Sequence, residues 1–421
     1  MRYPGDLIYT GTMSITLPSL AILPPPPSPA TPASLSAAYR PTISSIVSAL
    51  KGLETSTELL IVLPCPSLHG QLHLPRRKIY AEVQKLLGGL YSLICIVCAN
   101  LGADVDLDTP GAIDSRIILL DYDPSQTSMT DVESTLDPFV SGPVIDLPTF
   151  SLTRRRWNLI FSVDGEEGQR LLSAYMNLAN RISPPVEGHL RTVSGGVSLV
   201  HKGLQLSHQP QTASTHNVVI VGGTFDHIHA GHKLLLTALA LILQPASRLS
   251  TAPRRLIVGI TGDELLKNKK YAEFVGSWDQ RQQDVVNFFV SILSFTRAGK
   301  EEALNTLRYN EPGPNGKAVH TTLKTGFITI ECVEIQDPYG PTITDESITA
   351  IVVSGETRAG GQAVNERRVE KGWHALELFE VDVLDATEHE GGSGKNDDFA
   401  SKISSTAIRK RKAEIARTSS L

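Results

Sequence analysis

The chain has 421 residues, of which 41% are hydrophobic and 20% charged, and its formal net charge is −5. This length predicts two domains of a globular protein, and the negative charge argues against a dedicated nucleic-acid-binding protein, which needs a basic surface. The chain has no uninterrupted run of 18 apolar residues, so we expect no membrane span. Four cysteines are few for this length and indicate a reducing compartment. We expect the cytoplasm, with the mitochondrion as the alternative.

The first part of the chain is predicted to be a proline-rich disordered tail, residues 1–40, followed by a separate α/β domain, residues 41–183. Hydrophobic periodicity favours an alternation of helices and strands in that domain. The predicted helices cover residues 42–53, 78–90 and 169–179, and the predicted strands cover residues 59–63, 92–99, 117–120 and 157–163.

This N-terminal part contains no recognisable set of catalytic residues. Cys95 and Cys98 form a CxxC motif inside an apolar run, without the second CxxC or nearby histidine pair that a zinc site needs, so we expect a buried, inert pair. The basic run that begins at Arg154 is expected to be a solvated edge. Residues 184–215 are rich in Pro, Gly, Ser and Gln and are predicted to be the interdomain linker.

The second domain, residues 216–421, opens with the stretch around which the chain is organised. Residues 218–221 are β-branched and predict a buried parallel strand, which Gly222 and Gly223 end. An apolar helix follows from about Gly231. The turn between them is filled with polar side chains, namely Thr224, Asp226, His227, His229 and His232. A helix start at the carboxyl end of a strand offers free N–H groups to a phosphate, and Gly231 lets the phosphate come close.

Further polar groups follow later strands of this domain. A strand over residues 255–260 precedes Lys267 and Lys269, either of which could reach a phosphate at the same edge. A helix over residues 278–293, a Gly/Pro insertion loop over 309–325 and a strand over 326–334 come next. A strand over 350–353 precedes Arg358, whose guanidinium suits phosphate. A helix over 362–371, a strand over 376–383 and a last helix over 407–416, capped by hydroxyl residues, complete a doubly wound parallel sheet.

These motifs resemble the phosphopantetheine adenylyltransferases of the eukaryotic and archaeal type, within the HxGH nucleotidylyltransferase superfamily. The resemblance covers about residues 216–415 and rests on five segments: GGTFDHIHAGH, VGITGDELLKNK, DPYGPT, VVSGETRAGG and ISSTAIR. It implies a Rossmann-like domain that transfers AMP from ATP to 4′-phosphopantetheine, giving dephospho-coenzyme A and pyrophosphate in coenzyme A biosynthesis, with Mg²⁺ accompanying ATP. No phosphate loop of a kinase follows, so we expect no kinase activity.

The resemblance also implies the roles of individual residues. The catalytic residues would be His229, His232 and Lys267, with Lys269 left open as the lysine that bridges the phosphates. The substrate-binding residues would be Gly223, Thr224, Phe225, Lys267, Lys269 and Arg358. The ATP-binding residues would be His229, Gly231, His232, Gly355, Asn365, Ser404, Ser405, Thr406 and Arg409. No side chain is expected to hold a resident metal.

Four questions stay open at this point. The acceptor could instead be a cytidylyl or nicotinamide-mononucleotide substrate of another transferase in the superfamily. The chain could also be a noncatalytic scaffold. The sequence assigns no role to residues 1–200, which could bind a protein partner such as another enzyme of coenzyme A biosynthesis, and it does not set the oligomeric state.

Overall fold

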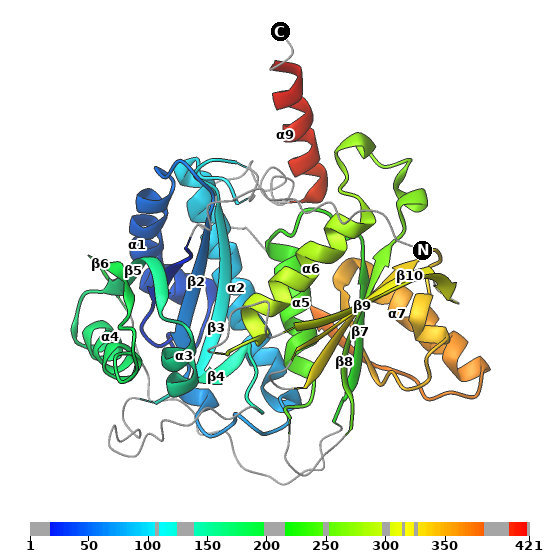
Figure 1. Ribbon diagram of the computed structural model, residues 1–421, viewed down its shortest axis with the longest axis horizontal. Coiled ribbons are helices and arrows are strands. Elements are labelled where there is room, and N and C mark those ends of the chain that lie inside the picture. The colour runs from blue at the N-terminus through cyan, green and yellow to red at the C-terminus, as the bar shows by residue number, and fades with distance from the viewer. Residues whose placement is uncertain are drawn as a thin grey trace, which may run out of the picture.

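The structure is a computed structural model that describes residues 17–105, 109–123, 139–197, 215–246, 252–296, 304–313, 316–323, 327–382 and 404–418. Two mainly parallel β-sheets lie side by side, each with helices packed against it (Figure 1). The predicted α/β class is therefore confirmed.

The N-terminal half is built on a six-stranded parallel sheet with the order β4-β3-β2-β1-β5-β6. Its elements in chain order are β1 Ser19–Ile22, α1 Pro32–Leu50, β2 Thr57–Pro64, α2 Arg77–Leu101, β3 Ile113–Asp121, β4 Val144–Asp146, α3 Leu147–Thr153, β5 Arg156–Val163, α4 Glu166–Ala179 and β6 Glu187–Val193.

The structure differs from the predicted disordered tail over residues 1–40. Strand β1 lies in the middle of the sheet with all four side chains buried, and α1 begins at Pro32. Thr31 caps α1 by accepting a hydrogen bond of 3.2 Å from the Ser34 amide. Proline is favoured in the first turn of a helix, so part of the proline cluster marks a helix start. Residues 1–16 of the predicted tail lie outside the described residues.

The predicted strand over residues 92–99 is wrong, because this segment continues the preceding helix as α2. A Cβ on Gly89 would lie 2.5 Å from Leu35 Cδ1, so this glycine lets α1 and α2 approach. Helix α2 is long and apolar enough to cross a membrane, yet 67% of its apolar window is buried inside the protein. Cys95 and Cys98 lie buried on α2, and burial raises the pKa of each thiol to about 12, as expected of an inert pair.

The segment predicted to be the linker contains β6, which pairs with β5 at the edge of the first sheet. Most side chains of β6 are exposed, so the strand has no apolar alternation that a sequence pattern could detect. Residues 198–214 of the predicted linker lie outside the described residues.

The C-terminal half is built on a seven-stranded sheet with the order β13-β12-β7-β8-β11-β10-β9. Its elements are β7 Val218–Gly223, α5 Ala230–Ile242, β8 Arg254–Thr261, α6 Trp278–Leu293, β9 Leu304–Gly313, β10 Gly316–Leu323, β11 Ile328–Ile335, β12 Ala350–Ser354, α7 Arg358–Glu370, β13 Glu377–Val381 and α9 Ser405–Thr418. The predicted insertion loop over 309–325 is instead mostly the antiparallel hairpin β9–β10. The five other strands are parallel, and the strand order reverses between β7 and β12, where a Rossmann-like sheet binds its ligands.

The two halves are not independent bodies, and the separate N-terminal domain that we expected is not confirmed. Helix α2 of the first half packs against α5 of the second (Figure 1), and one cluster of buried apolar side chains runs through both. Arg154, expected at a solvated edge, is half-buried instead. Its guanidinium donates to the carbonyl oxygens of Ser291 and Ser294, at 3.1 and 3.0 Å, and so caps the end of α6.

Candidate functional site

The turn from β7 into α5 is held in a strained conformation. Phe225 and His227 both have φ near 50°, a region that residues other than glycine rarely adopt. Phe225 is fully buried, and its ring leaves little room at Gly223, where a Cβ would lie 3.0 Å away. Gly223 therefore allows the turn to fold back on itself, and its carbonyl accepts a hydrogen bond of 3.2 Å from the hydroxyl of Thr261 at the end of β8.

Asp226 fixes this turn to two segments that are distant in the chain. Its buried carboxylate accepts hydrogen bonds from the amide of Gly276, at 3.1 Å, and from the guanidinium of Arg409, at 2.5 Å. The hydroxyl of Ser405 donates to the carbonyl oxygen of Asp226 at 2.8 Å. The beginning of α9 is thus fixed against the β7–α5 turn, although the two segments are far apart in the sequence. No pattern in the sequence predicted these contacts of Asp226.

Arg281 on α6 joins the loops that follow β7 and β8. Its buried guanidinium donates to the carbonyl oxygens of Thr224, at 2.7 Å, and Thr261, at 2.8 Å, and to Asp263 Oδ1 at 2.7 Å. The sequence placed Arg281 in the first turn of a helix but gave no sign of these contacts. They fix two strand ends of the sheet relative to each other.

His229 and His232 lie together at the start of α5, with their rings stacked at a centroid distance of 3.9 Å and an interplanar angle of 27°. His232 Nδ1 lies 3.2 Å from the carbonyl oxygen of His227. A carbonyl only accepts, so Nδ1 carries the hydrogen and the neutral ring presents the Nε2 lone pair. His229 is the opposite tautomer, because its Nδ1 accepts a hydrogen bond of 3.2 Å from the Gly231 amide. One ring therefore offers an N–H donor and the other an acceptor.

Both imidazoles are neutral near pH 7. Burial is the main cause, and neighbouring positive or titratable groups add to it. The pKa of His232 is lowered to about 4, and Lys269 contributes to this shift. The pKa of His229 is lowered well below its usual value by burial and by His232, Lys233 and His227.

Of the two candidate lysines, Lys269 is directed at the turn. Its Nζ donates a hydrogen bond of 3.0 Å to the Thr224 hydroxyl, and burial, followed by Arg409 and Arg281, lowers its pKa. Within the part of the chain that the structure describes, Lys269 forms no ion pair. Lys267 has a side chain that is 66% exposed and pairs with Glu264 at 2.5 Å.

Gly355 and Arg358, on the β12 side, lie at the same sheet edge but are less closely joined to the histidines, whereas Asn365 lies further along α7, beside the amino end of β13. Gly355 follows β12, and Arg358 begins α7 with an exposed side chain that pairs with Glu380 at 3.1 Å. Asn365 uses both ends of its amide on the backbone of Leu376, at 3.0 and 2.7 Å. This bonding braces the chain that enters β13.

The candidates on α9 form its first turn. The hydroxyl of Ser404 accepts a hydrogen bond of 3.3 Å from the Ala407 amide, as a helix cap does, and Thr406 accepts one of 3.1 Å from Arg409. Arg409 is buried, and its Nε also donates to the Lys270 carbonyl at 3.1 Å. The guanidinium of Arg409 therefore bonds to groups within the protein, whereas the first turn of α9 beside it faces the β7–α5 turn.

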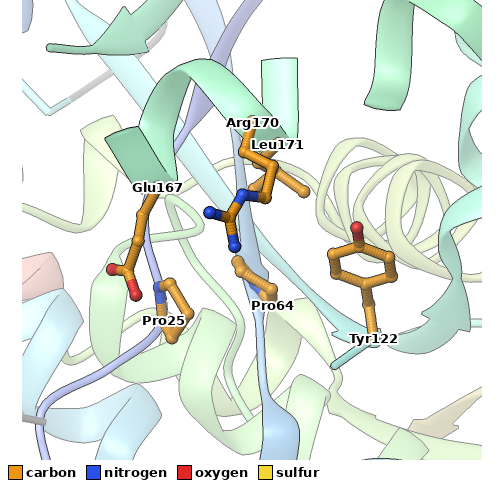
Figure 2. Close-up of a pocket in the computed structure, with 6 residues that line it drawn as sticks. All are labelled: Pro25, Pro64, Tyr122, Glu167, Arg170 and Leu171. Atoms are coloured by element: carbon orange, nitrogen blue, oxygen red, sulfur yellow. The ribbon is translucent and has the colours of Figure 1, made fainter. Parts of the chain in front are cut away.

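The described residues were also considered as possible metal ligands and as the lining of a pocket away from the histidines. No group of three or more His, Cys, Asp or Glu side chains in the described ranges could hold a metal ion. A small pocket lies at the carboxyl edge of the first sheet, far along the chain from the histidines (Figure 2). Its lining residues are Pro25, Pro64, Tyr122, Glu167, Arg170 and Leu171.

Comparison with known proteins gives one family model and several relatives, each of which matches part of the chain. Residues 12–199 match a domain of unknown function, DUF8446. An uncharacterized Schizosaccharomyces pombe protein is 36% identical over 199 residues, 47% of this chain and 49% of that protein. The phosphopantetheine adenylyltransferase of Saccharomyces cerevisiae is 35% identical over 201 residues, 48% of this chain and 50% of its own length. The chain thus spans about half the length of these two relatives.

Archaeal relatives are matched over more of their length. The phosphopantetheine adenylyltransferase of Pyrococcus abyssi is 28% identical over 191 residues, 45% of this chain and 87% of its own. A solved structure of an Archaeoglobus fulgidus protein with unknown function covers 39% of this chain at 23% identity, with a TM-score of 0.24. About half of this chain is therefore distantly related to proteins named phosphopantetheine adenylyltransferase.

Proposed function

We propose that the protein is a nucleotidyltransferase that transfers AMP from ATP to 4′-phosphopantetheine, giving dephospho-coenzyme A and pyrophosphate. One observation carries the proposal: a stacked pair of neutral histidines begins a helix at the point where the strand order reverses, next to a lysine that forms no ion pair with any described carboxylate. A helix start, N–H donors and a cation are the groups that bind a polyphosphate. The names of the relatives supply the choice of acceptor.

The reaction needs no side chain as a nucleophile. A phosphate oxygen of 4′-phosphopantetheine attacks the α-phosphorus of ATP, and the bond from that phosphorus to the pyrophosphate oxygen breaks. Such transfers depend on positioning and on stabilisation of developing charge. The substrate is ATP with its Mg²⁺, and we expect the phosphate oxygens to hold the ion, because the described residues contain no cluster of metal ligands.

The tautomers of the two histidines suggest different roles for them. His229 presents Nε2–H and can donate to a phosphate oxygen while it is neutral. His232 presents a lone pair and can donate only after Nε2 is protonated, which a bound polyanion favours by raising its pKa. We assign Lys269 and Thr224 to the phosphate shared by donor and acceptor. Arg409 is assigned to fixing α9 against Asp226, and Arg358 to the outer, acceptor side.

A labelling experiment tests this proposal. The purified full chain is incubated with ATP or, in parallel, with CTP, each labelled at the α-phosphate. Separate reactions contain 4′-phosphopantetheine, nicotinamide mononucleotide or a phosphorylated alcohol that accepts cytidylyl groups. We expect label to enter dephospho-coenzyme A with one pyrophosphate released per transfer. Transfer to nicotinamide mononucleotide alone, or from CTP alone, would identify another transferase of this kind. No transfer to any acceptor would leave a noncatalytic scaffold.

A further inference from the structure

A buried charge cluster joins the two halves of the protein directly behind the histidine pair. Lys233 on α5 forms an ion pair with Asp114 on β3, and both side chains are almost fully buried, at 3% and 4% exposure. Asp114 also pairs with Arg116, which lies 3.6 Å from Glu58. Arg116 in turn donates to the hydroxyl of Ser291 on α6 at 2.6 Å.

Lys233 is connected to the site through its backbone. Its amide donates to the carbonyl oxygen of His229 at 2.9 Å, which is the first hydrogen bond of α5, and His232 is its chain neighbour. A displacement of the lysine side chain would therefore move the first turn of the helix that carries both histidines. The partner that fixes this side chain, Asp114, belongs to the half that matches a domain of unknown function.

The cluster also keeps the carboxylate of Asp114 charged. Burial alone would raise the pKa of Asp114, but Arg116 and Lys233 hold it below its usual value, so the carboxylate is charged at pH 7. The carboxylate offsets the positive charge of Lys233 close to the histidines. Without it, a buried ammonium group would remain uncompensated close to His229, whose pKa Lys233 already lowers, and next in the chain to His232, which must gain a proton to donate to a bound polyanion.

We infer that Asp114 is a positioning residue for the histidine pair, so that the N-terminal half sets both the placement and the electrostatic environment of the site in the C-terminal half. This inference rests on the proposed function and gives the first half a role that needs no ligand or partner of its own. Asp114 acts through Lys233 and does not touch substrate.

Other charged or titratable groups also act on the histidines and on Lys233, and they stay unchanged in the test. Around the histidines these are Asp226, His227, Lys269 and Lys412. Around Lys233 and Asp114 they are Glu58, Tyr91, Cys95, Cys98 and Arg116.

Four variants of the full chain test the inference: Asp114→Asn, Lys233→Met, the double variant, and Arg154→Met as control. The control removes a half-buried arginine that crosses the same interface but contacts α6 and not α5. The pH dependence of kcat for pyrophosphate release is measured for each, together with the thermal midpoint. The pH dependence of the affinity for inorganic tripolyphosphate is measured by calorimetry, because it requires no turnover.

In Asp114→Asn, we expect the alkaline limb of both profiles to move to lower pH by up to about one unit, which is the order of shift that a single charge produces across about 10 Å of a medium with a dielectric constant near 20. Above that limb, kcat falls roughly tenfold, since a one-unit shift changes the protonated fraction tenfold. Lys233→Met moves the limb to higher pH, and it still tests the inference if Asp114→Asn does not fold. The double variant returns the limb to its wild-type pH. Arg154→Met lowers the thermal midpoint and leaves the limb in place.

The inference is overturned if the limb stays in place in both single variants, if Arg154→Met moves it equally, or if the double variant is no closer to wild type than Asp114→Asn. Failure of the proposed function gives a different result. In that case the wild-type chain releases no pyrophosphate with 4′-phosphopantetheine, while the tripolyphosphate profiles still show whether Asp114 acts on the histidines.

Discussion

The two lysines after β8 offer a matched pair of substitutions, Lys269→Met and Lys267→Met, with opposite expected outcomes. Lys269 Nζ lies 3.0 Å from the Thr224 hydroxyl and forms no ion pair among the described residues. Lys267 is mostly exposed and is already paired with Glu264. Both variants remove the same charge from the same loop, so a general effect of charge or loop composition would act on both alike.

The magnitude follows from what each lysine contacts. Removing one donor that stabilises charge in the transition state costs about 10²- to 10³-fold in kcat, and we expect this loss for Lys269→Met. Lys267→Met breaks an exposed ion pair, which contributes about 0.2–1 kcal/mol at most. The pair lies away from the turn, so we expect kcat to stay within about fivefold of wild type, the factor that even 1 kcal/mol would produce.

The assay is pyrophosphate release from ATP with saturating 4′-phosphopantetheine, at equal concentrations of folded protein. The thermal midpoints of both variants serve as the check on folding and are expected to stay near wild type, because neither lysine is deeply buried. The assignment of Lys269 is refuted if Lys269→Met keeps turnover within about fivefold of wild type, or if Lys267→Met loses as much.

Three further predictions concern the framework around the site. A Cβ on Gly142 would lie 1.7 Å from the carbonyl oxygen of Ile292, so Gly142→Ala should lower the free energy of unfolding by about 1–3 kcal/mol in chemical denaturation; an unchanged midpoint would contradict the close packing of the two halves. Arg409→Met leaves Asp226 buried without its cation and should cost about 3–5 kcal/mol in the same measurement, whereas a neutral result would show that the carboxylate finds another partner. The pKa of His232 is about 4 in the folded protein and near 6.5 when unfolded, so its contribution to stability is complete above pH 6.5 and is lost as the pH falls towards 4, at up to about 1.4 kcal/mol per pH unit; a His232→Asn variant with the same pH dependence of unfolding as wild type would disprove this shift.

The sequence predicted the central turn well because local signals agree there. Four β-branched residues, two glycines and an apolar helical run determine β7, the turn and α5 without help from distant contacts. The later strands β8 and β12 were also located, since buried parallel strands are short apolar runs with clear ends. The capped start of α9 followed from its Ser-Ser-Thr cluster.

What the sequence missed depends on contacts between distant residues. The strand β1 is only four residues long and is stabilised by pairing with β2 and β5 on either side. Helix α2 continues through the predicted strand over residues 92–99 because its apolar side chains pack in the interior, where a short apolar run does not distinguish a helix from a strand. The partners of Asp226 and Lys233 are 183 and 119 residues away in the chain, so no spacing rule could connect them.

The choice between the two lysines shows the same limit on a smaller scale. Spacing along the chain favoured Lys267, but the short 3-10 helix Asp263–Leu266 after β8 turns Lys267 outwards to Glu264 and brings Lys269 to Thr224. A shift of two residues within a loop cannot be read from composition. It is decided by how the loop packs, here through the bond from Arg281 to Asp263.

The central claim is that the stacked histidines stabilise charge on a nucleotide, and the most direct measurement is the turnover of His232→Asn with ATP and 4′-phosphopantetheine. His374→Asn, at an exposed histidine far along the chain, is the matched control. We predict that kcat for pyrophosphate release falls by about 10²- to 10³-fold in His232→Asn, while the control keeps wild-type turnover. Turnover of His232→Asn close to that of the control would contradict the account.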